Sequence, residues 1–79
     1  MFEADIYPAS EHVTLTRREV EILTLVVEGH PSKEVADILY ISKRTVDFHL
    51  DNVYGKLQVK NKMQAFQKAT KLGLLSQAA

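Results

Sequence analysis

Apolar positions recur with a helical period along most of this chain, and most clearly over residues 43–57. There they follow one another at intervals of four, three and four residues, which places them on one face of an α-helix: Val46, Leu50, Val53 and Leu57. The opposite face of the same helix carries a different set, Arg44, Phe48, Asp51, Asn52 and Gly55. The pattern predicts a helix with one buried side and one side available to a partner.

A second helix is predicted immediately before this one. Ser32 is its expected N-cap, Ser42 is the expected N-cap of the helix that follows, and the expected buried side is Val35, Ala36, Ile38 and Leu39. Between the two helices, Tyr40 and Ile41 leave room for a turn of about three residues, which is typical of a helix-turn-helix. That motif binds DNA by placing its second helix in the major groove.

Two further helices flank this pair. The first is expected to begin after Thr16, which has capping-box spacing to Glu19, and to end at Gly29, before Pro31. Its apolar side is Val20, Ile22, Leu23, Val26 and Val27. The last helix begins with a similar spacing of Asn61 and Gln64, buries Ala65, Phe66, Ala69 and Leu72, and ends at Gly73. Val59, Leu74 and Leu75 are expected to complete the core.

These segments together predict an all-α fold, a four-helix domain with a central helix-turn-helix over residues 15–75. Residues 1–14 mix apolar and acidic side chains without sustained periodicity and are interpreted as an arm or linker, and residues 76–79 as a tail. The apolar members of the arm are candidates for docking on the domain.

The composition fits one small domain and excludes several classes of protein. The chain has 79 residues, 46% of them hydrophobic, and contains no cysteine, which excludes disulfides and thiolate metal sites. No apolar run approaches the roughly 18 residues of a membrane span. His12, His30 and His49 lack the spacing of a metal site, and no group of side chains suggests catalysis. We therefore expect a soluble cytoplasmic protein, not an enzyme, without cofactor and without membrane association.

Charge is distributed unevenly although the net charge is +0. Residues 1–41 carry three basic and eight acidic groups, a balance of −5, whereas residues 42–79 carry seven basic and two acidic groups, a balance of +5. This asymmetry favours a phosphate-bearing partner on one side of the molecule. The alternative is a set of solvated lysines on a terminal helix.

Several spaced motifs resemble the DNA-binding domain of LuxR/FixJ-type transcriptional regulators. They are LTxRExE at 15–21, EG at 28–29, KEVA at 33–36, ISxxTVxxHL at 41–50, KL at 56–57, and the spacing of Ala65, Ala69 and Gly73. The resemblance implies a bacterial regulator domain that binds double-stranded DNA, usually as a homodimer through its last helix, in the nucleoid. It implies RNA polymerase as a further candidate partner, and in relatives of the response-regulator type a signal-receiving domain commonly precedes this one.

Candidate DNA-binding residues lie along the third helix. Lys43, Arg44 and Thr45 open it, where the helix N-terminus favours phosphate and an arginine suits bidentate contact with guanine. Thr45, His49 and Lys56 lie on one flank, and the resemblance implies that they touch phosphate. Asn52 joins the outward face. The alternatives are ordinary surface charge, a helix-start hydroxyl for Thr45 and a half-buried packing role for His49.

Asp47, Phe48 and Asp51 depart from the family pattern, which commonly has basic or small polar residues at the two acidic positions. Carboxylates there oppose phosphate, yet aspartate can accept a hydrogen bond from cytosine, and a phenylalanine ring can contact a thymine methyl group. An alternative function is therefore a protein-interaction module that keeps the fold and uses this surface on a protein partner.

Met63, Gln67 and Thr70 lie on the side of the last helix away from its apolar face. They are the candidates for a two-fold dimer contact, which would match a palindromic DNA site. The alternative is a solvated helix face.

Overall fold

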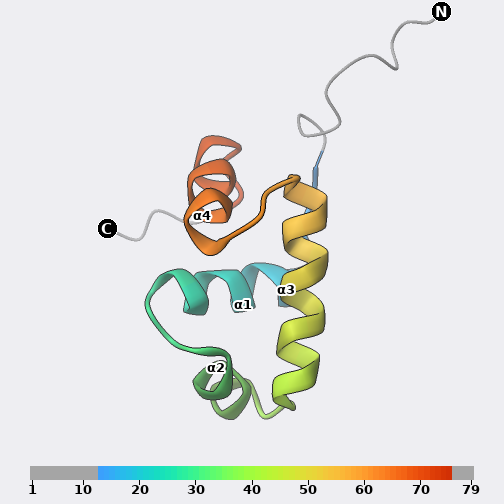
Figure 1. Ribbon diagram of the computed structural model, residues 1–79, viewed down its shortest axis with the longest axis vertical. Coiled ribbons are helices and arrows are strands. Elements are labelled where there is room, and N and C mark those ends of the chain that lie inside the picture. Colours follow the sequence, from blue (N-terminus) through green and yellow to red (C-terminus); the bar gives the residue numbers. More distant parts are fainter. Residues whose placement is uncertain (1–12, 76–79) are drawn as a thin grey trace, which may run out of the picture.

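The computed structural model describes residues 13–75, and its four helices are α1 (Arg17–Val27), α2 (Ser32–Leu39), α3 (Lys43–Leu57) and α4 (Lys62–Lys71). No strand occurs among the described residues, so the predicted all-α fold is confirmed. α3 is the longest helix and packs against all three others (Figure 1). Most of the predicted arm and the whole tail, residues 1–12 and 76–79, lie outside the described part.

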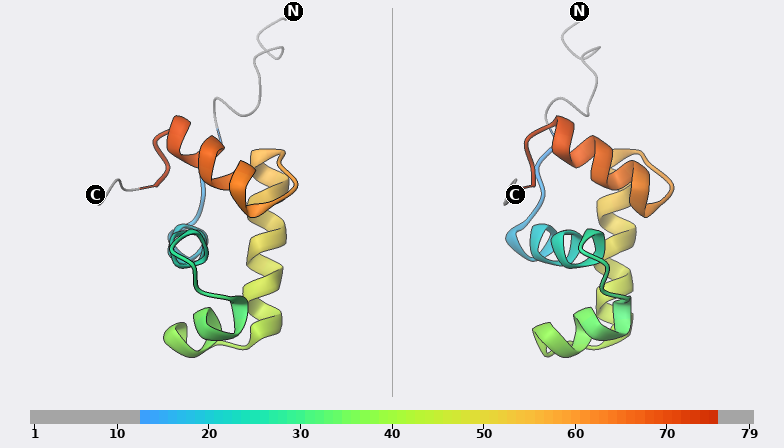
Figure 2. Two further views of the ribbon diagram at one scale, coloured as in Figure 1. Left: turned by 60° about the vertical axis from the view of Figure 1, so that its left-hand side comes forward. Right: turned by 90° about the vertical axis from the view of Figure 1, so that its left-hand side faces the viewer.

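The core forms two clusters along α3. One lies where α1, α2 and the first half of α3 meet, and it buries Ile22, Val26, Val35, Ala36, Val46 and Leu50. The other joins α1, the second half of α3, α4 and the residues after it, and it buries Leu23, Val53, Leu57, Ala65, Ala69 and Leu75. The predicted apolar stripe of α3 is therefore buried along its whole length, with its first half in one cluster and its second half in the other. In the ribbon, α2 lies beside the start of α3 and α4 beside its end (Figure 2).

The helix boundaries follow largely from local capping. The Thr16 hydroxyl accepts from the Glu19 backbone N–H at 3.1 Å, and the Glu19 carboxylate accepts from the Thr16 backbone N–H at 2.9 Å, as the capping-box spacing predicted. Ser42 caps α3 and Asn61 caps α4. Gln64 does not complete a capping box, because its side-chain oxygen accepts from the backbone N–H of Lys60, one residue before the cap.

The turns are those that the sequence predicted. Tyr40–Ser42 alone connects α2 to α3, with Tyr40 in the left-handed conformation (φ 59°, ψ 42°). Gly29 and Gly73 follow the C-caps of α1 and α4 with positive φ angles of 108° and 75°, the conformation that a glycine adopts at lowest cost. The short turn Tyr40–Ser42 fixes α2 close to the start of α3.

Besides the capping role of Gln64, three further sequence predictions were wrong. Ser32 does not cap α2, because Pro31 occupies the N-cap position and Ser32 is the first helical residue. Ile38 was expected in the core but is 47% exposed, and Phe66 was expected in the core but is 41% exposed. Both side chains have the helical spacing of a buried face, but each lies at the edge of that face, where the other helices of residues 13–75 cover it only in part.

Candidate nucleic-acid interface

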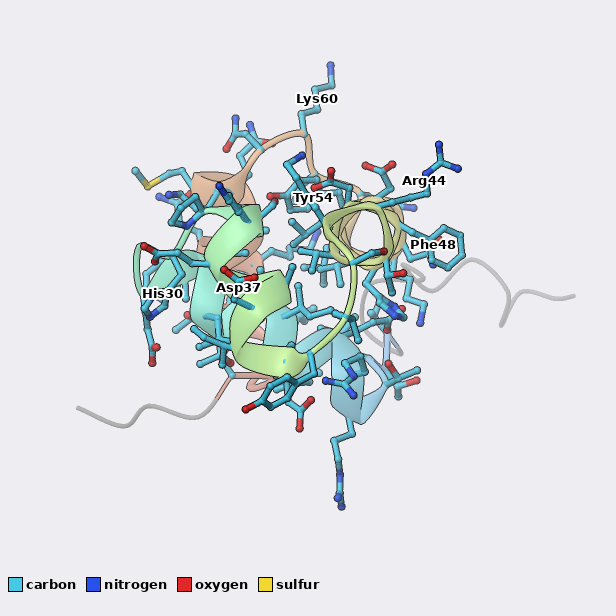
Figure 3. All side chains as sticks on the ribbon, turned by 90° about the horizontal axis from the view of Figure 1, so that it is seen from below. His30, Asp37, Arg44, Phe48, Tyr54 and Lys60 are labelled. Atoms are coloured by element: carbon cyan, nitrogen blue, oxygen red, sulfur yellow. The ribbon has the colours of Figure 1, made fainter. Side chains whose placement is uncertain are left out.

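The outer face of α3 is a shallow open depression lined by five side chains: Lys43, Arg44, Asp47, Phe48 and Asp51. Phe48 is 60% exposed although it is aromatic, and Arg44 and Asp51 are exposed on either side of it. Arg44 and Phe48 project from α3 in the same direction, away from the body of the molecule (Figure 3). The structure therefore brings the central members of the predicted DNA-binding set together on one surface.

Residues at the start of α3 present a preorganised N-terminus. The Ser42 hydroxyl oxygen accepts from the Thr45 backbone N–H at 3.0 Å and donates to the Thr45 hydroxyl at 2.9 Å. Thr45 thus has the helix-start role that the sequence left as an alternative, and its half-buried hydroxyl is already in a hydrogen bond. The first helical positions after the cap are Lys43 and Arg44, both exposed, so two cations stand where the helix dipole is positive.

Lys43 and Asp47 form an ion pair across one helical turn, with Nζ and Oδ2 at 2.8 Å. The Lys43 ammonium first, and the Ser32 hydroxyl second, hold the pKa of Asp47 below its usual value, so this carboxyl is ionised at neutral pH. In the free protein, each charge therefore offsets the other. Asp51 has no such partner among residues 13–75, so the acidic character of this face comes chiefly from Asp51.

Two of the three flank residues of α3, Thr45 and His49, are half-buried, whereas Lys56 is exposed. His49 and Asn52 are partly covered, like Thr45, and the His49 ring lies edge-on to Phe48 with centroids 5.7 Å apart and an interplanar angle of 64°. This contact orients the exposed Phe48 ring from one side. His49 thus has the packing environment that the sequence left open, with its remaining surface toward solvent.

Lys56, at the far end of the predicted site, is itself exposed but pairs with a buried carboxylate. Its Nζ donates to Glu19 Oε1 at 2.7 Å, and Glu19 is only 3% exposed. Burial tends to raise the pKa of Glu19, but hydrogen bonds from Lys56 and from the Thr16 backbone outweigh it and lower the pKa below 4.5. Sequence reasoning assigned Glu19 to the cap alone and missed this pair, which no local spacing indicates because the two residues lie 37 positions apart.

Gly55, on the outward face of α3, has no neighbour within the described chain that requires glycine. A Cβ atom built there meets nothing within 4 Å, and the residue is exposed. Glycine inside a helix costs about 1 kcal/mol relative to alanine. Packing among residues 13–75 does not explain that cost.

The outer side of α4 is a second exposed surface. Met63 is 64% exposed and Gln67 is exposed, whereas Thr70 is half-buried and its hydroxyl oxygen is buried without a hydrogen-bond partner among the described residues. Phe66 lies between them along the helix and belongs to the same surface. The surface that carries the predicted dimer set, Met63, Gln67 and Thr70, therefore also exposes Phe66, which the sequence pattern had placed in the core.

Two other classes of site find no support in residues 13–75. No group of three or more histidine, cysteine, aspartate or glutamate side chains there could hold a metal ion. No helix in that range is long and apolar enough to cross a membrane.

Comparison with known proteins gives one consistent family. The family described as "Bacterial regulatory proteins, luxR family" matches residues 13–69. The transcriptional activator protein SolR of Ralstonia nicotianae (strain ATCC BAA-1114 / GMI1000) is 49% identical over 61 residues, which cover 77% of this chain and 26% of SolR. The transcriptional regulatory protein LiaR of Bacillus subtilis (strain 168) is 44% identical over 57 residues, or 72% of this chain and 27% of LiaR.

Among solved structures, that of the transcription factor GerE has a TM-score of 0.74 and 40% sequence identity, covering 78% of this chain and 92% of GerE. The chain thus spans about a quarter of the length of the two curated relatives but nearly the whole of this solved structure.

Proposed function

The chain belongs to the luxR family of bacterial regulatory proteins, and from this premise we propose that α3 enters the major groove of double-stranded DNA and reads its sequence. The domain is a DNA-binding domain of a transcriptional regulator. The observation that carries the proposal is the outer face of α3, whose side chains are exposed and converge around Phe48. The major groove is wide enough to admit one α-helix and offers a distinct pattern at each base pair.

The proposed reading residues are the exposed ones. Arg44 makes a bidentate contact with guanine, Phe48 packs against a thymine methyl group, and Asp51 accepts from the amino group of cytosine. In the free protein Lys43 and Asp47 form an ion pair at 2.8 Å. Lys43 therefore reaches a phosphate only by leaving Asp47 or by dividing its N–H donors between Asp47 and the phosphate. Asn52 lies at the edge of this face and serves as an additional hydrogen-bonding group.

Thr45, His49 and Lys56 are proposed to hold the DNA backbone and so to set the register of α3. Lys56 has three N–H donors, of which one is used on Glu19. Its side chain is 39% exposed, so the remaining donors are available to a phosphate without breaking the interior pair. On this proposal Lys56 joins the DNA backbone to the buried start of α1.

The assembly is likewise a proposal. Two copies pair through the outer side of α4, with Met63, Phe66, Gln67 and Thr70 in the contact, and bind a palindromic site in the bacterial cytoplasm. RNA polymerase is proposed as the further partner, and a signal-receiving segment of the response-regulator type as a companion of this domain.

The test is a fluorescence anisotropy titration of a random-sequence duplex between about 50 and 200 mM salt, a range over which neutralising several phosphates changes affinity by orders of magnitude. A linear fall of log affinity with log salt supports DNA binding, and selection of a preferred site followed by Arg44→Ala then tests the reading face. Absence of binding at low salt contradicts the proposal.

One observation favours a second function on the same surface. Phe48 is 60% exposed, and the depression around it holds two basic and two acidic side chains, so its charges cancel and attract a phosphate polymer less than a basic surface would. The alternative is a protein partner anchored on Phe48, Asp47 and Asp51. Phe48→Ala would then abolish capture of that partner and leave DNA affinity unchanged, whereas loss of DNA binding alone excludes this alternative.

A further inference from the structure

A second groove lies between α1 and α2 and takes no part in the proposed function. Seven residues line it: Val20, Glu21, Thr24, Leu25, Glu28, Ile38 and Leu39. Its apolar side chains include Ile38, which is 47% exposed, so this groove leaves a branched aliphatic side chain in water. None of the seven lines the depression on α3.

The groove opens away from the α3 surface. α1 turns Ile22, Leu23 and Val26 into the two core clusters beside α3, and the groove-lining residues of α1 lie on its other sides. His30, which follows α1, lies on the opposite side of the molecule from Arg44 and Phe48 (Figure 3). A partner seated in the groove therefore leaves the outer face of α3 free.

Near the groove, carboxylates stand at the C-terminal ends of helices, where a negative charge destabilises the fold. Glu28 is the C-cap residue of α1, Asp37 stands in the last turn of α2, and neither helix has a basic residue in its last turn. A helix C-terminus is the negative end of the helix dipole, so carboxylates there are unfavourable and cations are favourable. A partner in the groove that brings a cation to Glu28 would relieve part of this unfavourable charge.

The opposite end of the groove is closer to neutral. Glu21 is paired with Arg18 at 3.3 Å between Oε1 and Nη1. The strongest attraction for a cation is therefore expected at the end that Glu28 marks, while Val20, Leu25, Ile38 and Leu39 supply an apolar floor.

We propose that this groove binds a cationic amphipathic helix of a partner protein. Apolar side chains one turn apart on such a helix would cover Ile38 and Leu25, and flanking lysines or arginines would face Glu28, which lines the groove. The chain's own residues 1–12 do not have this chemistry, because they contain Glu3, Asp5 and Glu11 and no lysine or arginine. Charge complementarity therefore favours a separate basic partner.

The test uses a designed peptide of about 14 residues, roughly four helical turns. Leucines at positions i, i+3, i+4 and i+7 form one face, and lysines fill the rest. A peptide with glutamates in place of the lysines is the control. The protein is labelled with ¹⁵N, and its amide resonances are followed during titration. The proposal expects saturable shifts concentrated in residues 20–28 and 37–39 with the lysine peptide, and none with the glutamate peptide.

Two variants test the groove itself. Ile38→Ala removes half-exposed apolar surface and is expected to weaken binding of the lysine peptide about fivefold. Glu28→Lys is expected to weaken it about three- to tenfold, since it replaces an attractive charge by a repulsive one. The exchange places a cation at the negative end of α1, so loss of the fold does not account for a weaker complex.

Matched controls are available on other surfaces. Phe66→Ala removes exposed apolar surface from α4, and Asp51→Lys makes the same charge reversal on α3; both are expected to leave binding of the lysine peptide within about twofold. The proposal is overturned if the glutamate peptide binds equally well, if the shifts map to α3 or α4, or if Glu28→Lys has no effect. It is also overturned if the groove resonances depend on protein concentration alone, which would identify a second copy as the occupant.

Discussion

The Lys56 ammonium lies 2.7 Å from the carboxylate of Glu19, although 37 positions separate the two residues. Glu19 also completes the cap of α1, where its carboxylate accepts from the Thr16 backbone N–H at 2.9 Å. One buried carboxylate thus joins the start of α1 to the last turn of α3. The position of α3, and with it the direction of its outer face, depends in part on this pair.

Lys56→Ala is expected to lower the free energy of unfolding by about 2 kcal/mol. The substitution leaves a buried carboxylate without its cation, which is costly, but Lys56 is partly exposed and the Thr16 hydrogen bonds remain, so the loss is smaller than for a fully buried pair. Urea unfolding followed by circular dichroism measures it. Lys56→Arg, which keeps the charge, is the control, and an unchanged unfolding midpoint for Lys56→Ala would show that the pair contributes nothing.

The same residue should affect DNA binding separately from stability. If Lys56 also contacts a phosphate, Lys56→Ala weakens binding on every sequence and lowers the salt slope by about one. Glu19→Gln keeps a side-chain oxygen for Thr16 and Lys56 and leaves the cation in place, so it should keep the full salt slope. An equal loss of slope in both variants would mean that the fold, and not the phosphate contact, is responsible.

Stability is expected to decline with acid below about pH 4.5, the ordinary pKa of the Glu19 side chain. Above that pH the carboxylate is ionised in both folded and unfolded chains, and its stabilising effect is fully present. Because its pKa is lower in the folded protein, the effect is lost as the pH falls from the unfolded pKa through the folded one. Urea unfolding between pH 3 and 6 measures this, and Glu19→Gln should show a shallower dependence than the parent protein.

Arg44→Ala is expected to weaken binding to a selected DNA site by about 1–3 kcal/mol and to relax the preference at one base pair. The residue is exposed at the start of α3, so its removal should leave the unfolding free energy nearly unchanged. Anisotropy titrations on the selected duplex and on duplexes changed at single positions separate the two effects. Uniform weakening on all duplexes would instead assign Arg44 to the backbone.

Asp51→Lys is expected to strengthen binding to random duplex DNA, to steepen the salt slope by about one, and to reduce discrimination between sites. Asp51 has no ion-pair partner in the described part of the chain, so its charge acts directly on an approaching phosphate. Asp47→Asn gives a comparison, since it releases Lys43 from the 2.8 Å pair. Unchanged discrimination in Asp51→Lys would count against a selective role for this carboxylate.

Phe66→Ala is expected to weaken pairing of two copies on a palindromic duplex by about tenfold, because it removes aromatic surface from the exposed side of α4. Sedimentation velocity on the protein–duplex complex distinguishes one bound copy from two. Ile38→Ala, which shortens an exposed apolar side chain on another face, is the control. If Phe66→Ala leaves the stoichiometry unchanged, as the control does, the outer side of α4 is not the dimer contact.

The sequence by itself determined the helices and most of their inner faces. Thr16 with Glu19, Ser42 and Asn61 act on backbone groups within one turn, so their effect depends on spacing alone. The stripe of α3 from Val46 to Leu57 is likewise a local consequence of helical periodicity, and all four of its side chains are buried.

Only the tertiary structure decided where each buried face ends and which distant charges meet. Periodicity assigned Ile38 and Phe66 to inner faces, but exposure depends on how far another helix covers that edge, and within residues 13–75 both side chains stay largely exposed. Lys43 and Asp47 lie one turn apart and could have been paired from the sequence. Glu19 and Lys56 could not, because their contact requires the angle and distance between α1 and α3, which are set by packing of the whole core.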